Sequence, residues 1–136
     1  MFLLDTNVLS ELWRRERTNP GVAAWADGVH PTDLCLSAIT ILEIEAGTLI
    51  LLRRDEVPGA ALRIWIDSKV LPAFDGRILS VDTAVAQRCA RLHVPDPKAE
   101  RDALIAATAL VHNLTVVTRN VIDFEPMGVD LLNPWR

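Results

Sequence analysis

The sequence predicts an α/β fold, a three-layer α/β/α arrangement with a short, mostly parallel central sheet. Short apolar segments rich in β-branched residues recur along the chain, and segments with helical periodicity follow them. No repeat, linker or low-complexity tract interrupts this alternation. Strands that are apolar throughout are typical of parallel sheets with helices on both faces. A chain of 136 residues fits a single domain of this kind, spanning residues 1–136.

In the first half of the chain, apolar runs predict the strands, and capping residues and prolines predict the helix limits. Asn19 before Pro20 is an N-cap followed by a proline at the first helical position, and Pro31 ends that helical region. We expect a helix break around Pro58–Gly59 and a stop at Pro72. Strands are expected at residues 2–5 and 34–37, and further helices at about 5–15, 38–54 and 60–71.

The second half continues the same alternation. Asp82 is expected to cap a helix, and Asn113 is a plausible C-cap for another. Pro95-Asp96-Pro97 marks a loop, because each proline disfavours a helix before it. Strands are expected at 78–81, 114–118 and near 129–132, helices at 83–92 and 99–112, and a loop over the rest of 119–136.

Composition limits the classes of protein that fit. No apolar run approaches the roughly 18 residues that span a bilayer. The N-terminus lacks a basic segment before an apolar one, so we expect no signal peptide and a cytoplasmic location. The net charge of −4 argues against a broad, nonspecific nucleic-acid binder, although it allows a local basic patch. Cys35 and Cys89 lie in apolar segments and are expected to be buried, reduced thiols.

Four acidic residues occur beside segments that should be buried. Asp5 follows the first strand, Glu43 lies inside an apolar helix, Asp102 opens an alanine-rich helix, and Asp123 follows the strand at 114–118. Ligands of open parallel sheets bind beyond the carboxyl ends of the strands, so these side chains can converge there. Carboxylates are rarely buried unless they are paired or bind a metal. The pattern therefore predicts a cation site.

The residue types of this site favour Mg²⁺ or Mn²⁺ over zinc. All four side chains offer oxygen ligands, which suit hard cations. A divalent ion also removes the repulsion among carboxylates that lie close together. His30, His93 and His112 lie outside the constellation and show no metal-ligand spacing. Since Mg²⁺ commonly binds substrate phosphates, the chemistry predicted is attack of a metal-activated water on a phosphodiester.

Each acidic residue also has a structural explanation of its own. Asp5 could cap the first helix, and Glu43 could lie half-exposed on a helix edge. Asp102 could simply favour a helix N-terminus through the helix dipole, and Asp123 could be a turn residue. Each alternative is reasonable for one residue taken alone. The conjunction of all four favours the cation site.

Four motifs occur in order along nearly the whole chain. They are Leu3–Glu11 (LLDTNVLSE), Ser37-x-x-Thr40-x-x-Glu43-x-x-x-Gly47, Asp102–Ala107 (DALIAA) and Thr118–Phe124 (TRNVIDF), with a tail at Leu132–Trp135 (LNPW). In these motifs the chain resembles PIN domains, specifically the VapC and FitB-like toxins of bacterial toxin–antitoxin pairs.

The resemblance implies a Mg²⁺- or Mn²⁺-dependent endoribonuclease that is inhibited by a cognate antitoxin. It assigns ligand or catalytic roles to the four acidic residues, with Glu43 either ligating the cation or orienting the attacking water. Cleavage would leave a 5′-phosphate and a 3′-hydroxyl. The supporting polar residues that it implies are Thr6, Asn7, Thr118 and Asn120.

Substrate and partner surfaces are less sharply marked. Arg119 is the best-placed candidate to bind RNA, and the other candidates are Arg14, Arg15 and Arg17. Trp13 and Trp25 could stack on bases, although a place in the core or at a partner interface is the more frequent role. The helix at 39–52 is apolar almost all round, which favours an interface in a homodimer or in a toxin–antitoxin hetero-oligomer.

Two other functions fit parts of the pattern. A haloacid-dehalogenase-like phosphatase also places an Asp after its first strand, but it needs a second Asp two residues later, where this chain has Asn7. A non-catalytic interaction module could keep the fold and bind a partner. Metal-dependent cleavage of RNA discriminates between the three.

Overall fold

The computed structural model describes the backbone of residues 1–136 and every side chain except that of Arg15. It contains a five-stranded sheet in the order β3-β2-β1-β4-β5. All four strand pairings are parallel, and Phe2 of β1 is in register with Leu34 of β2 and Thr115 of β4. The predicted α/β fold with a parallel sheet is confirmed. The strands are β1 (Phe2–Leu4), β2 (Leu34–Ser37), β3 (Ile78–Leu79), β4 (Thr115–Val117) and β5 (Leu131–Leu132).

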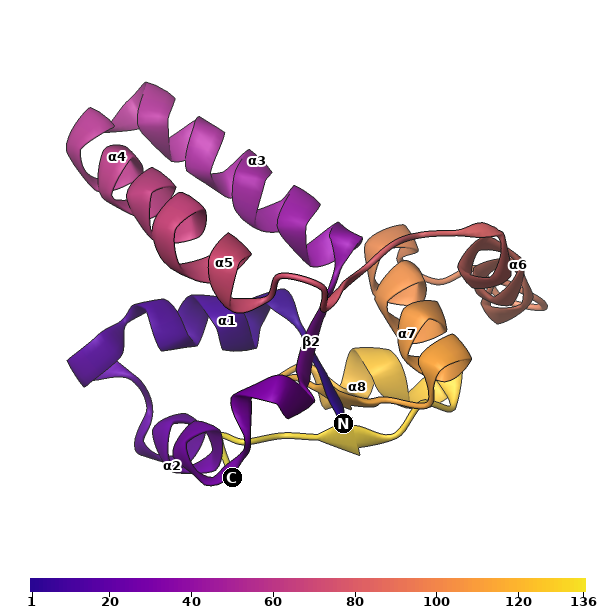
Figure 1. Cartoon of the computed structure of the whole chain (residues 1–136). Helices are drawn as coiled ribbons and strands as arrows, with labels where there is room; N and C mark the ends of the chain where they lie inside the picture. Colours follow the sequence, from indigo (N-terminus) through magenta and orange to yellow (C-terminus); the bar gives the residue numbers. More distant parts are fainter.

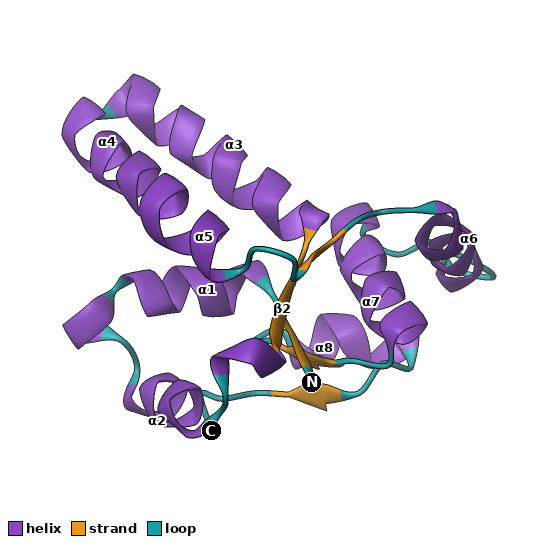
Figure 2. Cartoon of the chain, in the orientation of Figure 1, coloured by secondary structure: helices purple, strands orange, loops and turns teal.

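Helices cover both faces of the sheet (Figures 1 and 2). One group comprises α1 (Thr6–Trp13), α2 (Pro20–Gly28), α3 (Ala38–Arg54), α4 (Glu56–Trp65), the π-helical η3 (Ile66–Val70) and α5 (Leu71–Ala73). The other comprises α6 (Thr83–Leu92), α7 (Glu100–His112) and α8 (Val121–Phe124). Three short 3₁₀ segments, η1 (Arg15–Arg17), η2 (Pro31–Asp33) and η4 (Glu125–Met127), complete the chain.

Adjacent residues of each strand divide between two hydrophobic cores. Leu3 of β1 and Val116 of β4 pack with α6, α7 and α8, whereas Leu4 and Val117 pack with α1 and η3. This division follows from the strand geometry, because successive side chains point to opposite faces of a sheet. It explains why the strands are apolar at every position except Ser37 and Thr115, which lie at strand ends.

The helices α3 and α4 form a hairpin that projects from the sheet (Figure 1). The expected break around Pro58–Gly59 is wrong, because the chain turns at Asp55, which has extended backbone angles. Pro58 lies in the first turn of α4, where a missing N–H costs no intrahelical hydrogen bond. Gly59 is buried against α3, and a Cβ there would lie 2.7 Å from the Leu52 backbone. Helical structure also continues past Pro72 to Ala73.

The segment expected to be a loop at 119–136 contains more structure than predicted. The helix α8 and the following η4 turn lie between β4 and the short strand β5, which confirms the strand near 129–132. Phe124 is fully buried and Met127 nearly so. Together with the half-buried Val121, they form an i, i+3, i+6 apolar pattern that anchors this segment to the α7 side of the sheet.

Other predictions hold closely. The helices α3 and α6 have the predicted limits, with Asp82 accepting a hydrogen bond from the Val85 amide as the N-cap. Asn113 has a left-handed backbone at the end of α7, as expected for a C-cap. Cys35 and Cys89 are both buried free thiols. Within the described part of the chain, no helix is both long enough and apolar enough to cross a membrane.

Candidate acidic active site

Asp5 lies where β1 ends and α1 begins, in the middle of the sheet. Its Oδ1 accepts the Thr6 amide at 2.8 Å, so it caps α1 as one of the structural alternatives expected. Its Oδ2 accepts the Thr118 hydroxyl at 2.8 Å and the Asn7 amide at 3.2 Å. Capping therefore uses Oδ1, while the side chains of Thr118, which follows β4, and of Asn7 in α1 hold Oδ2. The carboxylate has a fixed orientation.

Burial raises the pKa of Asp5 above its ordinary value. The hydrogen bonds from Thr118 and Thr6 act in the opposite direction, and the nearby charge of Glu43 raises the pKa further. Only 5% of Asp5 is exposed to solvent. The hydrogen-bond donors around Asp5 therefore offset only part of the cost of burying its charge.

Glu43 lies on the first part of α3 and points toward α1. Its Oε1 accepts the Thr6 hydroxyl at 2.7 Å, and Thr6 also contacts the Thr40 hydroxyl at 3.5 Å. The other oxygen lies 3.8 Å from the guanidinium of Arg101, whose side chain is about half exposed. Thr6 thus connects the start of α1 to α3, because its backbone N–H donates a hydrogen bond to Asp5 and its hydroxyl donates one to Glu43.

Asp102 lies in the first turn of α7, and Asp123 lies on the exposed side of α8. Burial raises the pKa of Asp102, followed by the charges of Asp5, Asp123 and Glu43, in that order. The structure therefore brings all four predicted carboxylates together beyond the carboxyl ends of the strands. Their shared feature is mutual repulsion.

The predicted supporting residues differ in what they contribute. The Asn7 side chain bridges Asp5 and Thr118 through its amide nitrogen and accepts the Arg119 amide at 3.2 Å. Thr118 is fully buried and also accepts the Asn120 amide at 3.0 Å. Asn120 is exposed and enters this network through its backbone. Asn7 and Thr118 orient the acidic pocket directly.

Of the candidate RNA-binding arginines, Arg119 is connected to this pocket, because its backbone N–H donates a hydrogen bond to Asn7. Arg119 stacks over the ring of Trp135, with its guanidinium carbon 5.5 Å from the ring centroid. Arg14 forms an ion pair with Glu11 at 3.1 Å. The side chain of Arg15 lies outside the described part of the structure. A cavity of about 270 Å³ is lined by Glu11, Arg14, Arg17, Asn19, Arg119 and Trp135.

The two candidate tryptophans have different surroundings. Trp25 packs edge-on against Phe2, with centroids 5.3 Å apart, and therefore belongs to the core. Trp13 packs against Trp65 at 5.0 Å. Trp13 and Trp65 line a cavity of about 280 Å³ together with Thr6 and Glu43, so this aromatic pair adjoins the acidic pocket.

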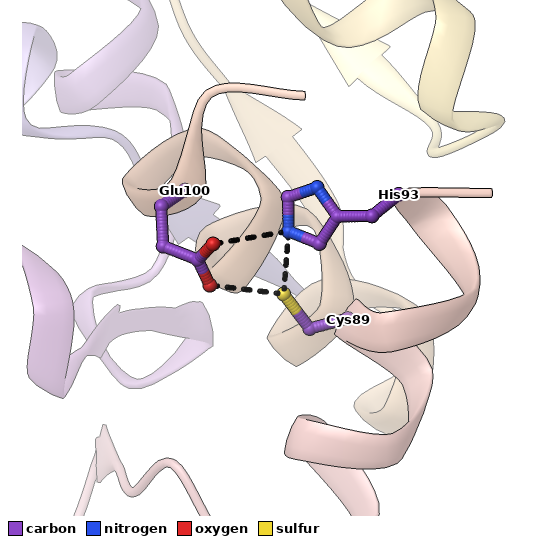
Figure 3. A group of neighbouring side chains, drawn as sticks. All are labelled: Cys89, His93 and Glu100. Atoms are coloured by element: carbon purple, nitrogen blue, oxygen red, sulfur yellow. Dashed lines mark hydrogen bonds and ion pairs between the residues drawn. The ribbon is translucent and has the colours of Figure 1, made fainter. Parts of the chain in front are cut away.

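Sequence reasoning missed two features at the start of α7. Arg101 lies next to Glu43, and its position one residue before Asp102 was the available signal. Cys89, His93 and Glu100 converge on the far side of this turn (Figure 3). His93 therefore takes part in a group of potential ligands, contrary to expectation; the i, i+4 spacing of Cys89 and His93 on α6 was the missed signal.

The sequence and the fold both have counterparts among known proteins. The PIN domain family matches residues 2–125. The chain belongs to the PIN-domain family. The VapC ribonuclease Y4jK of Sinorhizobium fredii is 36% identical over 100% of this chain and 99% of its own length. Toxin FitB of Neisseria gonorrhoeae is 40% identical over 100% and 99%, respectively.

A solved structure has the same architecture as this PIN domain. The crystal structure of FitAcB from Neisseria gonorrhoeae is 39% identical, covers 100% of this chain and 99% of its own chain, and superposes with a TM-score of 0.91. The similarity extends over the whole sheet and both helical layers. The resemblance to the VapC and FitB group, first indicated by the four motifs, is confirmed.

Proposed function

We propose that this protein is a metal-dependent endoribonuclease and the toxin of a toxin–antitoxin pair, with residues 1–136 acting as one domain. The observation that carries the proposal is the convergence of Asp5, Glu43, Asp102 and Asp123, in which burial and mutual repulsion raise the pKa of two members. Membership of the PIN-domain family and full-length similarity to a VapC ribonuclease support the same activity.

The donor set of the pocket fits a hard divalent cation. It contains carboxylate oxygens from four segments, and its repulsion is the penalty that a bound cation removes. Asp5, Asp102 and Asp123 would hold Mg²⁺ or Mn²⁺, and Glu43 would either join them or orient the attacking water. Such an ion, when bound, lowers the pKa of a coordinated water and offsets the negative charge of the phosphoryl group.

The residues of the chain supply orientation and a proton acceptor. Thr118 and Asn7 donate hydrogen bonds to Asp5 Oδ2. These bonds hold the Asp5 side chain in one rotamer, facing the side of the pocket where the substrate would bind. The Thr6 hydroxyl fixes Glu43 Oε1, which leaves Oε2 to accept a proton from the attacking water. Fixed carboxylates reduce the reorganisation needed when charge develops on the phosphate. The expected products carry a 5′-phosphate and a 3′-hydroxyl.

The substrate is expected to be RNA, gripped by cations beside the acidic pocket. The Arg119 backbone N–H donates a hydrogen bond to Asn7 at this edge, and Arg119, Arg14 and Arg17 line one cavity. These side chains can neutralise phosphates that flank the cleaved bond, although the chain as a whole is acidic. An RNA substrate is consistent with the expected cytoplasmic location.

The expected protein partner is a cognate antitoxin, which follows from similarity to a relative named as a toxin. A groove of about 580 Å³ runs between α1 and α4 and contains Trp13, Ile64 and Trp65. Trp13 and Trp65 also line the cavity beside Glu43, so the groove adjoins one side of the acidic pocket. An antitoxin segment bound there would reach the carboxylates and block RNA.

The projecting hairpin offers a second apolar surface, consistent with the predicted homodimer. Leu49, Ile50, Val57 and Ile64 are each more than half exposed. Patches of this kind commonly mark protein interfaces. The apolar helix at 39–52 is thus expected to contribute to assembly as well as to the core.

The decisive experiment measures RNA cleavage with Mn²⁺ or Mg²⁺ and after addition of EDTA. The variant Glu43→Gln should lose activity, whereas Glu45→Gln, on the same helix, should retain it because Glu45 pairs with Arg63 instead. Asp5→Asn should be inactive as well. Cleavage unaffected by EDTA or by these changes would refute the proposal.

Two other outcomes identify the rival functions. Hydrolysis of a small phosphoester without RNA cleavage would favour the phosphatase. A folded protein that binds a partner but cleaves neither substrate would favour the interaction module. Mapping the ends of cleaved cellular RNA after induced expression would then define the target.

A further inference from the structure

Cys89, His93 and Glu100 form the one group, among the described residues, in which three potential ligand atoms lie within 4.8 Å of one another. Cys89 lies in the last turn of α6, His93 is the C-cap residue that follows this helix, and Glu100 is the first residue of α7. Figure 3 shows their side chains pointing toward a common centre. The acidic pocket does not include any of them. Their chemistry therefore needs a separate account.

We propose that these three side chains bind a zinc-class divalent ion through a sulfur, a nitrogen and an oxygen ligand. Sulfur and imidazole ligands favour Zn²⁺ over Mg²⁺, which distinguishes this site from the all-oxygen pocket. The ion would link the end of α6 to the start of α7. It would thereby anchor the turn that carries Asp102, two residues after Glu100.

The distances suit tetrahedral coordination. Cys89 Sγ lies 3.7 Å from His93 Nε2 and 3.9 Å from Glu100 Oε1, and His93 Nε2 lies 3.2 Å from Glu100 Oε2. Zinc bonds of about 2.0–2.3 Å place tetrahedral ligand atoms roughly 3.4–3.6 Å apart. The two contacts of Glu100 use different oxygens, so a rotation of its carboxylate would present one oxygen to the ion.

The burial of the three groups also fits a bound ion. Cys89 is 3% exposed, which excludes water from the sulfur side. The side chain of His93 is 22% exposed and that of Glu100 is 70% exposed, so ions can enter from the Glu100 side. A water molecule can occupy the fourth position there. Cys35, the other buried thiol, belongs to no such ligand group among the described residues.

Binding requires a defined rearrangement of protons. The Lys98 amide donates to His93 Nδ1 at 3.0 Å, so the ring proton resides on Nε2 and points to Glu100. When the ion binds, this proton moves to Nδ1, the Cys89 thiol releases its proton to solvent, and the Lys98 amide turns to water. Residues 94–97 are exposed, so the loop can adjust without disturbing the core.

The test uses the full-length, reduced protein with CoCl₂ as a spectroscopic probe and ZnCl₂ as its competitor. Cobalt bound by a thiolate gives a near-ultraviolet charge-transfer band, which carboxylates alone do not produce. Wild type and Cys35→Ser should both show this band at one ion per chain, and zinc should abolish it. Cys89→Ser should lack it. Zinc should raise the Tm of the first two proteins by more than that of Cys89→Ser, in which only the acidic pocket remains to bind it.

Second variants guard against a folding defect. Circular dichroism establishes whether Cys89→Ser folds. The variants His93→Gln and Glu100→Gln keep the thiol. Each should weaken zinc binding by more than the roughly 10–100-fold that is typical when a residue that only contacts a metal ligand is changed. The Asp102→Asn variant should keep the cobalt band, which separates this site from the acidic pocket. Absence of the band in wild type, its survival in folded Cys89→Ser, or unchanged zinc affinity in His93→Gln and Glu100→Gln would overturn the proposal.

Discussion

Two polar clusters meet at the first turn of α7, and they differ in how their charges are balanced. In one cluster, the charges of Asp5, Glu43 and Asp123 repel the charge of Asp102. In the other cluster, Glu100 faces an imidazole and a thiol, which complement it. A fold tolerates a repulsive cluster when function requires it. The difference in charge balance is consistent with our proposals that the acidic pocket is the catalytic centre and that the other cluster anchors the turn.

The largest expected effect comes from removing one charge of the repulsive cluster. Asp102→Asn should reduce RNA cleavage by about 10²–10³-fold, the usual cost of losing a group that stabilises transition-state charge. The measurement is the single-turnover rate on RNA at saturating Mn²⁺. A rate within tenfold of wild type would show that Asp102 is not part of the catalytic centre.

The next effect concerns orientation within the same cluster. Thr6→Val removes the hydroxyl that holds Glu43 Oε1 at 2.7 Å, while keeping the shape of the side chain. We expect kcat to fall by roughly 10–100-fold with little change in KM, because misplaced catalytic groups lose rate rather than affinity. Thr6→Ser should restore most of the activity. Equal losses in both variants would point to a packing role for the methyl group instead.

The pH dependence of stability tests the repulsion itself. Asp102 has a pKa raised above its ordinary value of 3.8, so in the metal-free protein the folded state retains a proton that the unfolded state has lost. The free energy of unfolding contributed by this group therefore falls as pH rises from about 3.8 through the folded pKa, and stays reduced above it. Asp102→Asn should be the more stable protein at pH 7, and about 1 kcal/mol would raise Tm by roughly 4 °C.

The measurement is the Tm difference between wild type and Asp102→Asn in EDTA, followed from pH 4 to pH 7. A difference that grows with pH supports a raised pKa of Asp102 in the folded protein. The Asn19 amide lowers the pKa of Glu11, and Arg63 lowers the pKa of Glu45. These two groups make the protein more stable as pH rises, by the same amount in wild type and in the variant. They therefore cancel in the comparison. A difference that shrinks with rising pH would contradict the proposed repulsion.

The smallest effect is expected on the complementary side. Glu100→Gln makes the same carboxylate-to-amide change two residues before Asp102, but the Glu100 side chain is 70% exposed. In EDTA-treated protein reloaded with Mg²⁺, RNA cleavage should stay within about twofold, and stability should change by less than about 1 kcal/mol. A loss comparable to that of Asp102→Asn would mean that the two clusters act as one.

Much of the fold could be predicted because local signals agree with the global arrangement. Asn19, Asp82 and Asn113 mark helix ends by their own side-chain and backbone chemistry, and the structure places them there. The break predicted at Pro58 was wrong because proline is compatible with the first turn of a helix as well as with a helix break. The helix α8 escaped notice because its stability depends on burying Phe124 against a distant part of the chain.

For the site, ordered motifs identified all four carboxylates that the fold brings together. Their hydrogen bonds could not be predicted, because Thr118 reaches Asp5 across 113 positions of sequence. The same limit hid the approach of Arg101 to Glu43. Cys89 and His93 were interpreted as isolated residues because their third partner comes from the next helix. Side-chain pairs between elements require the assembled structure.

The central position of β1 has a consequence for synthesis of the protein on the ribosome. The first strand can complete its hydrogen bonding only when β4, more than 110 residues later, has emerged and paired with it. Asp5 directly follows β1, and Asp123 lies in α8, which follows β4. A nascent chain consequently carries no assembled acidic pocket until its last quarter has been translated, which would delay the proposed activity relative to the start of translation.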